Sequence, residues 1–148
     1  MKIIGFGKCS LDKIIKSENK IGFYLPKDYK EFILNKNGGY PEKKYATFKV
    51  EELNQEISID TLYGFELEKQ LNLEEYYNEY KEELLEDTII IGDDMGGGMI
   101  VLVNQKCIKG IYYWDHSHYF ELSNKESNSY KIADSFKEFI DNLKEYEE

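Results

Sequence analysis

The sequence predicts one domain in which amphipathic helices accompany an antiparallel β-meander. Residues 25–40, which read LPKDYKEFILNKNGGY, spell a helix with a marked start and a marked stop. Three short apolar segments between residues 88 and 114 are separated by turns, as in a meander. A capping box opens a last helix at Ser135. With 148 residues the chain is long enough for one ordinary core, so we treat residues 1–148 as a single domain.

The helix within residues 25–40 is bounded by residues typical of helix ends. Pro26 fits the first turn, because its missing N–H would be unpaired there anyway. Gly38 and Gly39 end the helix after Asn37, since glycine readily adopts the left-handed conformation of a C-cap. Helical spacing places three large side chains on its apolar face, namely Tyr29, Phe32 and Ile33. A shorter helix is expected before it, with Ser10 as N-cap.

Two strands and an acidic helix are expected in the middle of the chain. Residues 45–50 and 57–63 favour strands by their alternation and β-branched content. Asn72 then opens a helix, with Glu75 placed as in a capping box. Its expected apolar face comprises Leu73, Tyr76, Tyr77, Tyr80, Leu84 and Leu85. Its other face is rich in glutamate, which is most often no more than a solvated surface: Glu74, Glu75, Glu79, Glu82, Glu83 and Glu86.

The C-terminal half contains the three strands of the expected meander. These are residues 88–91, 99–103 and 107–114, the first two joined by the turn GDDMGGG at residues 92–98. The last helix begins at Ser135, and Phe136, Phe139, Ile140 and Leu143 form its core face.

The net charge of −10 is distributed unevenly along the chain. Residues 1–48 carry a net charge of +5 and residues 49–148 a net charge of −15. A nucleic-acid partner is therefore not expected, because the acidic part offers no basic stripe for phosphates. A basic protein partner suits this charge, although an ordinary acidic protein is its more common explanation. All 19 basic residues are lysine, which excludes enzymes that clamp their substrates with arginine.

The cysteines and the N-terminus are typical of a cytoplasmic protein. Cys9 and Cys107 lie far apart with no CxxC spacing, which is typical of the reduced thiols of a cytosolic protein. A disulfide between them is the alternative. The N-terminal apolar run is too short for a signal peptide or a membrane span. We therefore expect the cytoplasm and no contact with a membrane.

No segment has the pattern of a catalytic, cofactor or metal site. The turn at residues 92–98 lacks the Lys-Ser/Thr of a P-loop and leads into a strand, and Asp93 and Asp94 would repel an anion. The same two aspartates lack EF-hand spacing for Ca²⁺. A zinc site at Asp115, His116 and His118, or a Cys107–histidine pair, remains a weaker alternative to a polar turn and a structural thiol. We assign no catalytic residue, cofactor or metal.

Three ordered segments carry a resemblance to a known family. They are Leu25-Pro26 through Asn37-Gly38-Gly39, then Ile91-Gly92-Asp93 through the strand to Trp114-Asp115-His116, and Ile132-Ala133-Asp134-Ser135-Phe136 through Leu143. In this order and spacing the chain resembles the SUKH superfamily, the bacterial immunity proteins related to the yeast Smi and Knr regulators of cell-wall synthesis. The run of glycines from Gly96 to Gly98 departs from the single glycine that is more usual in the family.

The resemblance implies an α+β fold, a twisted and mainly antiparallel sheet with helices packed against it. It also implies a non-enzymatic immunity protein that binds and neutralises a cognate toxin, often a nuclease or deaminase. A regulatory or scaffold module of the Smi/Knr type is the alternative, and an enzyme of unknown class is a third. The shared residues are expected to be architectural: Pro26, Gly38, Gly39, Gly92, Asp93, Trp114, Ser135 and Phe136.

An acidic surface is the expected binding site for a basic toxin, with the protein as a monomer or weak dimer. Such a surface can cover the basic site of a toxin that acts on nucleic acid. The candidate residues are Glu51, Glu52, Glu56, Asp60, Tyr63, Glu75, Glu79 and Glu82. Tyrosine is enriched at binding hot spots, so Tyr63, Tyr76, Tyr77 and Tyr80 are possible anchors. For Tyr76 and Tyr80, which share the apolar stripe, a place in the core is the preferred interpretation.

Overall fold

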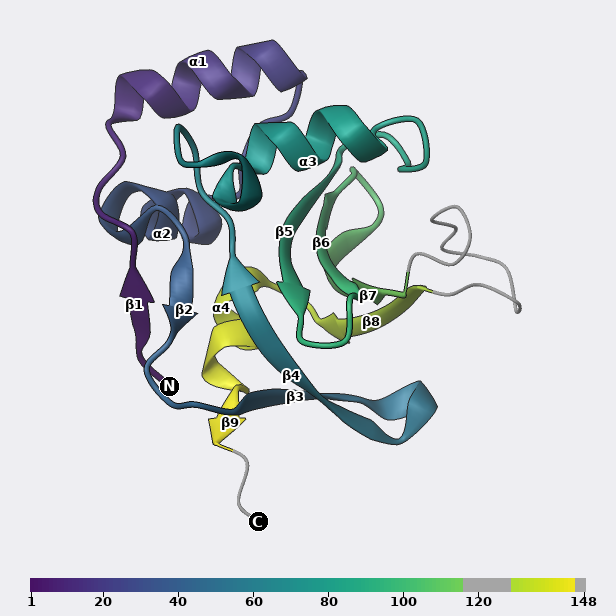
Figure 1. The fold of residues 1–148 in the computed structure, drawn as a ribbon. Helices are drawn as coiled ribbons and strands as arrows, with labels where there is room; N and C mark the ends of the chain where they lie inside the picture. Colours follow the sequence, from purple (N-terminus) through teal and green to yellow (C-terminus); the bar gives the residue numbers. More distant parts are fainter. Residues whose placement is uncertain (116–128, 146–148) are drawn as a thin grey trace.

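The structure is a computed structural model that describes residues 1–115 and 129–145 (Figure 1). Within these residues, nine strands form one sheet and four α-helices accompany it. The strands are β1 (Ile3–Gly5), β2 (Gly39–Pro41), β3 (Ala46–Val50), β4 (Gln55–Leu62), β5 (Thr88–Asp94), β6 (Met99–Asn104), β7 (Lys109–Trp114), β8 (Ser129–Ala133) and β9 (Lys144–Glu145). The helices are α1 (Leu11–Ile21), α2 (Lys27–Lys36), α3 (Leu73–Tyr80) and α4 (Phe136–Asp141), with 3₁₀ turns η1 (Glu51–Leu53) and η2 (Lys69–Leu71).

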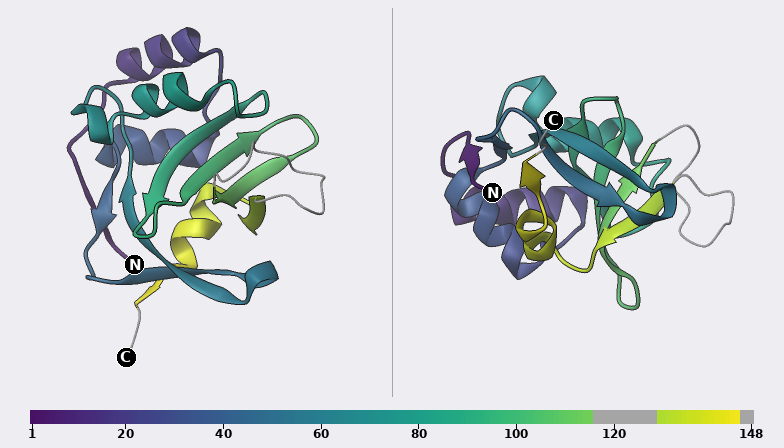
Figure 2. Two further views of the ribbon diagram at one scale, coloured as in Figure 1. Left: turned by 45° about the vertical axis from the view of Figure 1, so that its right-hand side comes forward. Right: turned by 90° about the horizontal axis from the view of Figure 1, so that it is seen from below.

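All pairings between the named strands are antiparallel, which confirms the predicted α+β class. The main path of the sheet runs β1-β2-β4-β5-β6-β7-β8. The long strand β4 also pairs with β3, and β3 pairs with the short β9. Strand β3 contacts β8 as well, so the sheet curls and brings strands distant along its path together (Figures 1 and 2). The buried residues of this curled sheet and of its helices form one hydrophobic core.

The helices lie in two groups around the sheet. Helices α1 and α3 lie side by side at one end of the molecule and run in the same direction (Figure 1), and α3 packs against β5. Helix α2 contacts α1, α4 and β1, while α4 packs against β7 and β8. The surface of α3 is therefore presented at the end of the molecule opposite the tip of the β3–β4 hairpin (Figures 1 and 2).

The helix ends follow the predicted capping residues. The Ser10 hydroxyl accepts a hydrogen bond from the backbone N–H of Lys13, and the Ser135 hydroxyl accepts one from Glu138 N–H. Pro26 is the residue immediately before α2 rather than part of its first turn. Asn37 ends α2 in the left-handed conformation, with φ of 51°. These local signals were readable from the sequence because each acts within a few residues.

The α2 C-cap does more than end a helix. The Asn37 side chain donates to the carbonyl of Phe65 at 2.9 Å and accepts from its N–H at 2.8 Å. A Cβ on Gly38 would lie 2.6 Å from the carbonyl oxygen of Leu62, and one on Gly39 would overlap the carbonyl of Ile4. Glycine is therefore required at these two positions by close backbone approach as well as by positive φ. The Asn-Gly-Gly stop thus joins α2 to the end of β4 and to β1.

The structure differs from the sequence prediction in several elements. Strands β1, β2, β8 and β9 were not predicted, and β7 begins at Lys109 rather than at Cys107. Helix α3 ends at Tyr80, whereas the sequence predicted helix to residue 86. Negative charge is unfavourable at a helix C-terminus, and three glutamates and an aspartate follow within seven residues of this one. The N–H of Glu83 instead bonds to the Tyr80 carbonyl, which closes a tighter turn.

Candidate functional site

The acidic turn between β5 and β6 is held by its own carboxylates. One oxygen of Asp94 accepts the N–H groups of Gly96 and Gly98 at 2.7 and 2.8 Å, and the other accepts the Tyr113 hydroxyl. Asp93 accepts the Thr61 N–H at 3.1 Å. Both aspartates therefore serve the fold, as expected for a structural turn.

The glycines of this region make room for close neighbours. A Cβ on Gly98 would overlap the Tyr113 hydroxyl, so glycine is needed there for Tyr113 to reach Asp94. A Cβ on Gly92 would lie 2.6 Å from the carbonyl oxygen of Thr61 on the neighbouring strand. Gly96 meets only one carboxylate oxygen, at 3.5 Å. Close neighbours therefore require glycine at positions 92 and 98, whereas position 96 has room for a small side chain.

Aromatic side chains of the core pack against the tyrosines of α3. The Tyr63 and Tyr76 rings stack with centroids 3.9 Å apart and planes 5° from parallel, and the Tyr63 hydroxyl donates to Asp93 at 2.6 Å. The Tyr80 ring meets Trp114 edge-on at 5.9 Å. Tyr63 is only 1% exposed, so it lies in the core and is not an anchor on the surface. The preferred interpretation of Tyr76 and Tyr80 as core-facing agrees with these contacts.

Burial shifts the pKa of both partners in the Tyr63–Asp93 hydrogen bond. Burial raises the pKa of Tyr63, and the hydrogen bond to Asp93 adds to this rise. Burial also raises the pKa of Asp93 above its ordinary 3.8, and the Tyr63 hydroxyl opposes that rise by donating to the carboxylate. The pair is consequently a neutral tyrosine donating to a carboxylate beneath α3.

The exposed face of α3 carries unpaired negative charge. Glu75, Glu79 and Glu82 are exposed, and none has an ion-pair partner among the residues that the structure describes. We call these three glutamates, which lie on α3 and the turn after it, the α3 acidic surface. Glu74, by contrast, is held by α1, accepting the Ser17 hydroxyl at 2.7 Å and Lys20 Nζ at 3.0 Å. That contact fixes α3 against α1, so the neighbouring glutamates are presented on a supported helix.

The predicted acidic residues fall on two separate surfaces rather than one. Glu51, Glu52 and Glu56 lie at the η1 end of the β3–β4 hairpin, which Figures 1 and 2 place away from α3. Glu51 pairs with Lys49 at 3.6 Å, and Lys49 also faces Glu56 across the strands. Asp60 lies further along β4, in a hollow beside Tyr40 and Met95. The hairpin charge is thus partly compensated, whereas that of the α3 acidic surface is not.

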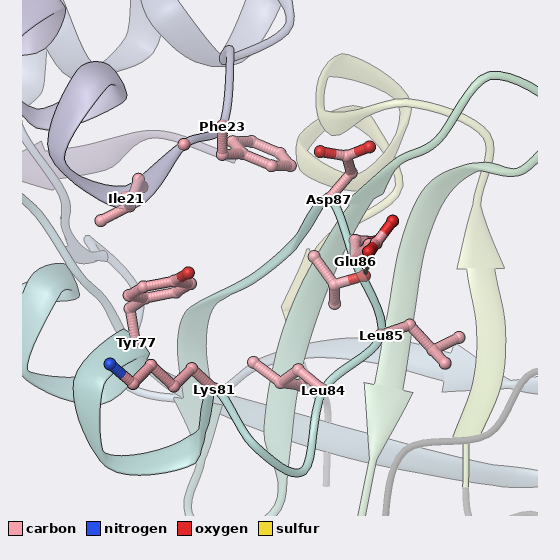
Figure 3. Close-up of a pocket in the computed structure, with 10 residues that line it drawn as sticks. Ile21, Phe23, Tyr77, Lys81, Leu84, Leu85, Glu86 and Asp87 are labelled. Carbon is pink, nitrogen blue, oxygen red and sulfur yellow. Dashed lines mark hydrogen bonds between the residues drawn. The ribbon is translucent and has the colours of Figure 1, made fainter.

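A pocket that the sequence did not reveal lies at the C-terminal end of α3, on the face of that helix that carries Tyr77. It occupies about 420 Å³ between the end of α1, the end of α3 and the start of β5 (Figure 3). We call it the helix-end pocket. Its lining is Ile21, Gly22, Phe23, Tyr77, Lys81, Leu84, Leu85, Glu86, Asp87 and Thr88. These residues come from three elements that only the tertiary fold brings together, and no local pattern marks them.

The described residues contain no cluster that could hold a metal ion. No group of three or more His, Cys, Asp or Glu side chains converges within them. Asp115 is exposed, and the predicted partners His116 and His118 lie outside the described residues. Cys9 is buried and Cys107 is exposed in the turn before β7, and both are free thiols. Burial raises the pKa of the Cys9 thiol, which keeps it protonated and unreactive.

Trp114 and Phe136, two further residues of the family motifs, are buried in the core. Trp114 is fully buried at the end of β7. Phe136 is buried between α4 and α2, with ring centroids 4.9 Å from Tyr29 and 4.8 Å from Phe32.

In the described part of the chain, no helix is both long enough and apolar enough to cross a membrane.

The fold and surface define a small α+β domain with an antiparallel sheet and an acidic helix at one end. Comparison with known families matches residues 8–142 to the model of the SMI1/KNR4 family (SUKH-1). The chain therefore belongs to the SUKH family, which is known for immunity proteins and is generally non-enzymatic. A similar protein is the SPbeta prophage-derived uncharacterized protein YokK of Bacillus subtilis (strain 168). It is 28% identical over 148 residues, covering 89% of this chain and 73% of the relative.

Proposed function

We propose that the protein is an immunity protein that binds a basic protein toxin through the α3 acidic surface and so neutralises it. Membership of the SUKH family supports the immunity role. The choice of surface is supported by its three unpaired glutamates, which lie on α3 and the turn after it, and by the contacts of Glu74 with Ser17 and Lys20 that fix α3 against α1. Exposed charge of one sign steers an oppositely charged partner and raises its association rate by about 10- to 1,000-fold. A toxin that acts on nucleic acid, such as a nuclease or deaminase, would present the complementary basic site.

Growth rescue in bacteria tests this function. Each candidate toxin encoded beside the gene is expressed alone, with the wild-type protein, and with the variant Glu75→Lys/Glu79→Lys/Glu82→Lys. We expect the wild-type protein to restore growth against one toxin, and we expect the variant to fail because its surface charge is reversed.

The β3–β4 hairpin provides a matched control. The variant Glu51→Lys/Glu52→Lys/Glu56→Lys makes the same change in net charge on the other acidic surface. It should rescue growth as the wild type does. Rescue by the α3 variant together with failure of the hairpin variant would move the binding site to the hairpin. If the wild-type protein rescues against none of the toxins, the immunity role is wrong, and the regulatory alternative is favoured.

A further inference from the structure

The C-cap of α2 contains the only Asn-Gly pair in the chain, Asn37-Gly38. In such a pair the backbone nitrogen of the glycine can attack the side-chain amide carbon of the asparagine. The new C–N bond closes a succinimide ring, the bond to the amide nitrogen breaks, and ammonia leaves with the proton of the glycine N–H. Water then opens the ring to aspartate or isoaspartate. Glycine permits this attack most readily, because it has no Cβ to hinder the approach.

The fold requires both residues of this pair. A Cβ on Gly38 would lie 2.6 Å from the carbonyl oxygen of Leu62, and Gly38 has φ of 83°. Asn37 has φ of 51°, and asparagine tolerates this left-handed conformation better than most residues do. The conditions that end α2 therefore place a chemically labile pair at its C-cap.

The structure holds the Asn37 side chain away from this reaction. Its amide nitrogen donates to the carbonyl of Phe65 at 2.9 Å, and its amide oxygen accepts the N–H of Phe65 at 2.8 Å. These two hydrogen bonds fix the plane of the amide, so the side chain cannot turn toward the Gly38 nitrogen while both remain. Asn37 is only 5% exposed and Gly38 is buried, which also limits the access of water. The reaction therefore needs a local opening of this contact.

Loss of the amide would weaken a joint between α2, the end of β4 and the start of α3. The carbonyl of Asn37 packs so closely on Gly64 that a Cβ there would overlap it. The carbonyl of Gly64 in turn accepts the N–H of Leu73, the first residue of α3, at 2.7 Å. A carboxylate in place of the amide has only acceptors, so one of its oxygens would face the Phe65 carbonyl with no proton between them. Isoaspartate would lengthen the backbone at the cap by a carbon atom.

We propose that Asn37-Gly38 is a conditional deamidation site, closed in the folded protein and opened when the contact between Asn37 and Phe65 separates. The product cannot restore this contact, because a carboxylate has no proton to donate to the Phe65 carbonyl. Deamidation thus converts a transient opening into a lasting loss of support for the start of α3. The proposal concerns the fold alone and does not depend on the proposed function.

Peptide mapping by mass spectrometry on the whole chain tests the site itself. The wild-type protein is incubated in mildly alkaline buffer with and without denaturing urea, and conversion of Asn37 from amide to acid is followed over time. We expect deamidation to be at least about tenfold slower in the folded protein, since the reactive state is then reached only by local opening. In urea, Asn37 should react faster than every other asparagine, because it alone precedes a glycine. Equal rates with and without urea, or no reaction of Asn37 in urea, would overturn the proposal.

Two variants test the structural consequence. Asn37→Asp introduces the product acid at the C-cap. Asn35→Asp makes the same change at an exposed position of α2, where the amide donates only to the Glu31 carbonyl at 2.8 Å. Hydrogen exchange at the Phe65 and Leu73 amides should become about tenfold faster in Asn37→Asp and change less than about twofold in Asn35→Asp. Failure of Asn37→Asp alone to fold would support the proposal as well, whereas equal exchange in the two variants would overturn it.

Discussion

Two buried polar side chains, Tyr29 and Asp94, differ in whether their oxygens are hydrogen-bonded. The Tyr29 hydroxyl is buried and has no hydrogen-bond partner among the described residues. Burial raises the pKa of Tyr29, so its hydroxyl stays neutral. Asp94 shows the opposite case, because both of its oxygens are occupied by donors from the turn and from β7. An unpaired buried group costs stability, whereas a paired one does not.

Replacing Tyr29 by phenylalanine should therefore stabilise the fold. The change removes the unpaired hydroxyl and keeps the ring contacts with Phe32 and Phe136. We expect the free energy of unfolding to rise by about 1 kcal/mol, the lower end of the cost of such a group. Urea denaturation at neutral pH measures this change. A loss of stability would show that the hydroxyl makes a favourable interaction in the folded protein.

The raised pKa of Asp93 predicts a pH dependence of stability. The fold favours the protonated carboxyl, so stability decreases as the pH rises above the ordinary pKa of 3.8 and levels off above the raised value. Asp93→Asn removes this titration while retaining a polar group near Tyr63. The free energy of unfolding of the variant minus that of the wild type should therefore rise through this pH window. Parallel stability curves for the two proteins would contradict the assignment.

At the scale of elements, local signals were predictable and long-range pairings were not. Ser10, Asn37 and Ser135 act on neighbouring residues, and the apolar runs of β5, β6 and β7 are visible in the sequence. Strands β1 and β9 are only two or three residues long and pair with residues far along the chain, as Ile3 does with Pro41. The burial of Tyr63 and the helix-end pocket depend in the same way on tertiary contacts.

The β5–β6 turn provides a prediction at this scale. Gly98→Ala should destabilise the protein by about 1–3 kcal/mol, because its Cβ would displace Tyr113 from Asp94. Gly96→Ala is the matched control, since its Cβ meets only the far end of one side chain. Thermal unfolding of both variants measures the difference. Equal stability of the two would mean that Tyr113 moves aside without cost.

At the scale of the whole molecule, the surface charge is divided between ends of the fold. The α3 acidic surface lies at one end, and the acidic tip of the β3–β4 hairpin lies at the other (Figures 1 and 2). Within the described ranges, only the first of these two surfaces is free of ion pairs. Charge at this end should govern the rate and the salt dependence of toxin binding, because exposed charges are screened by salt.

The most direct test is the affinity for the toxin identified by growth rescue, measured by calorimetry at low and high salt. The wild-type protein should bind more weakly as the salt concentration rises. Glu75→Lys/Glu79→Lys/Glu82→Lys should bind about 100-fold more weakly at low salt and lose most of this salt dependence. If the variant keeps the affinity and the salt dependence of the wild type, the α3 acidic surface is not the toxin-binding site.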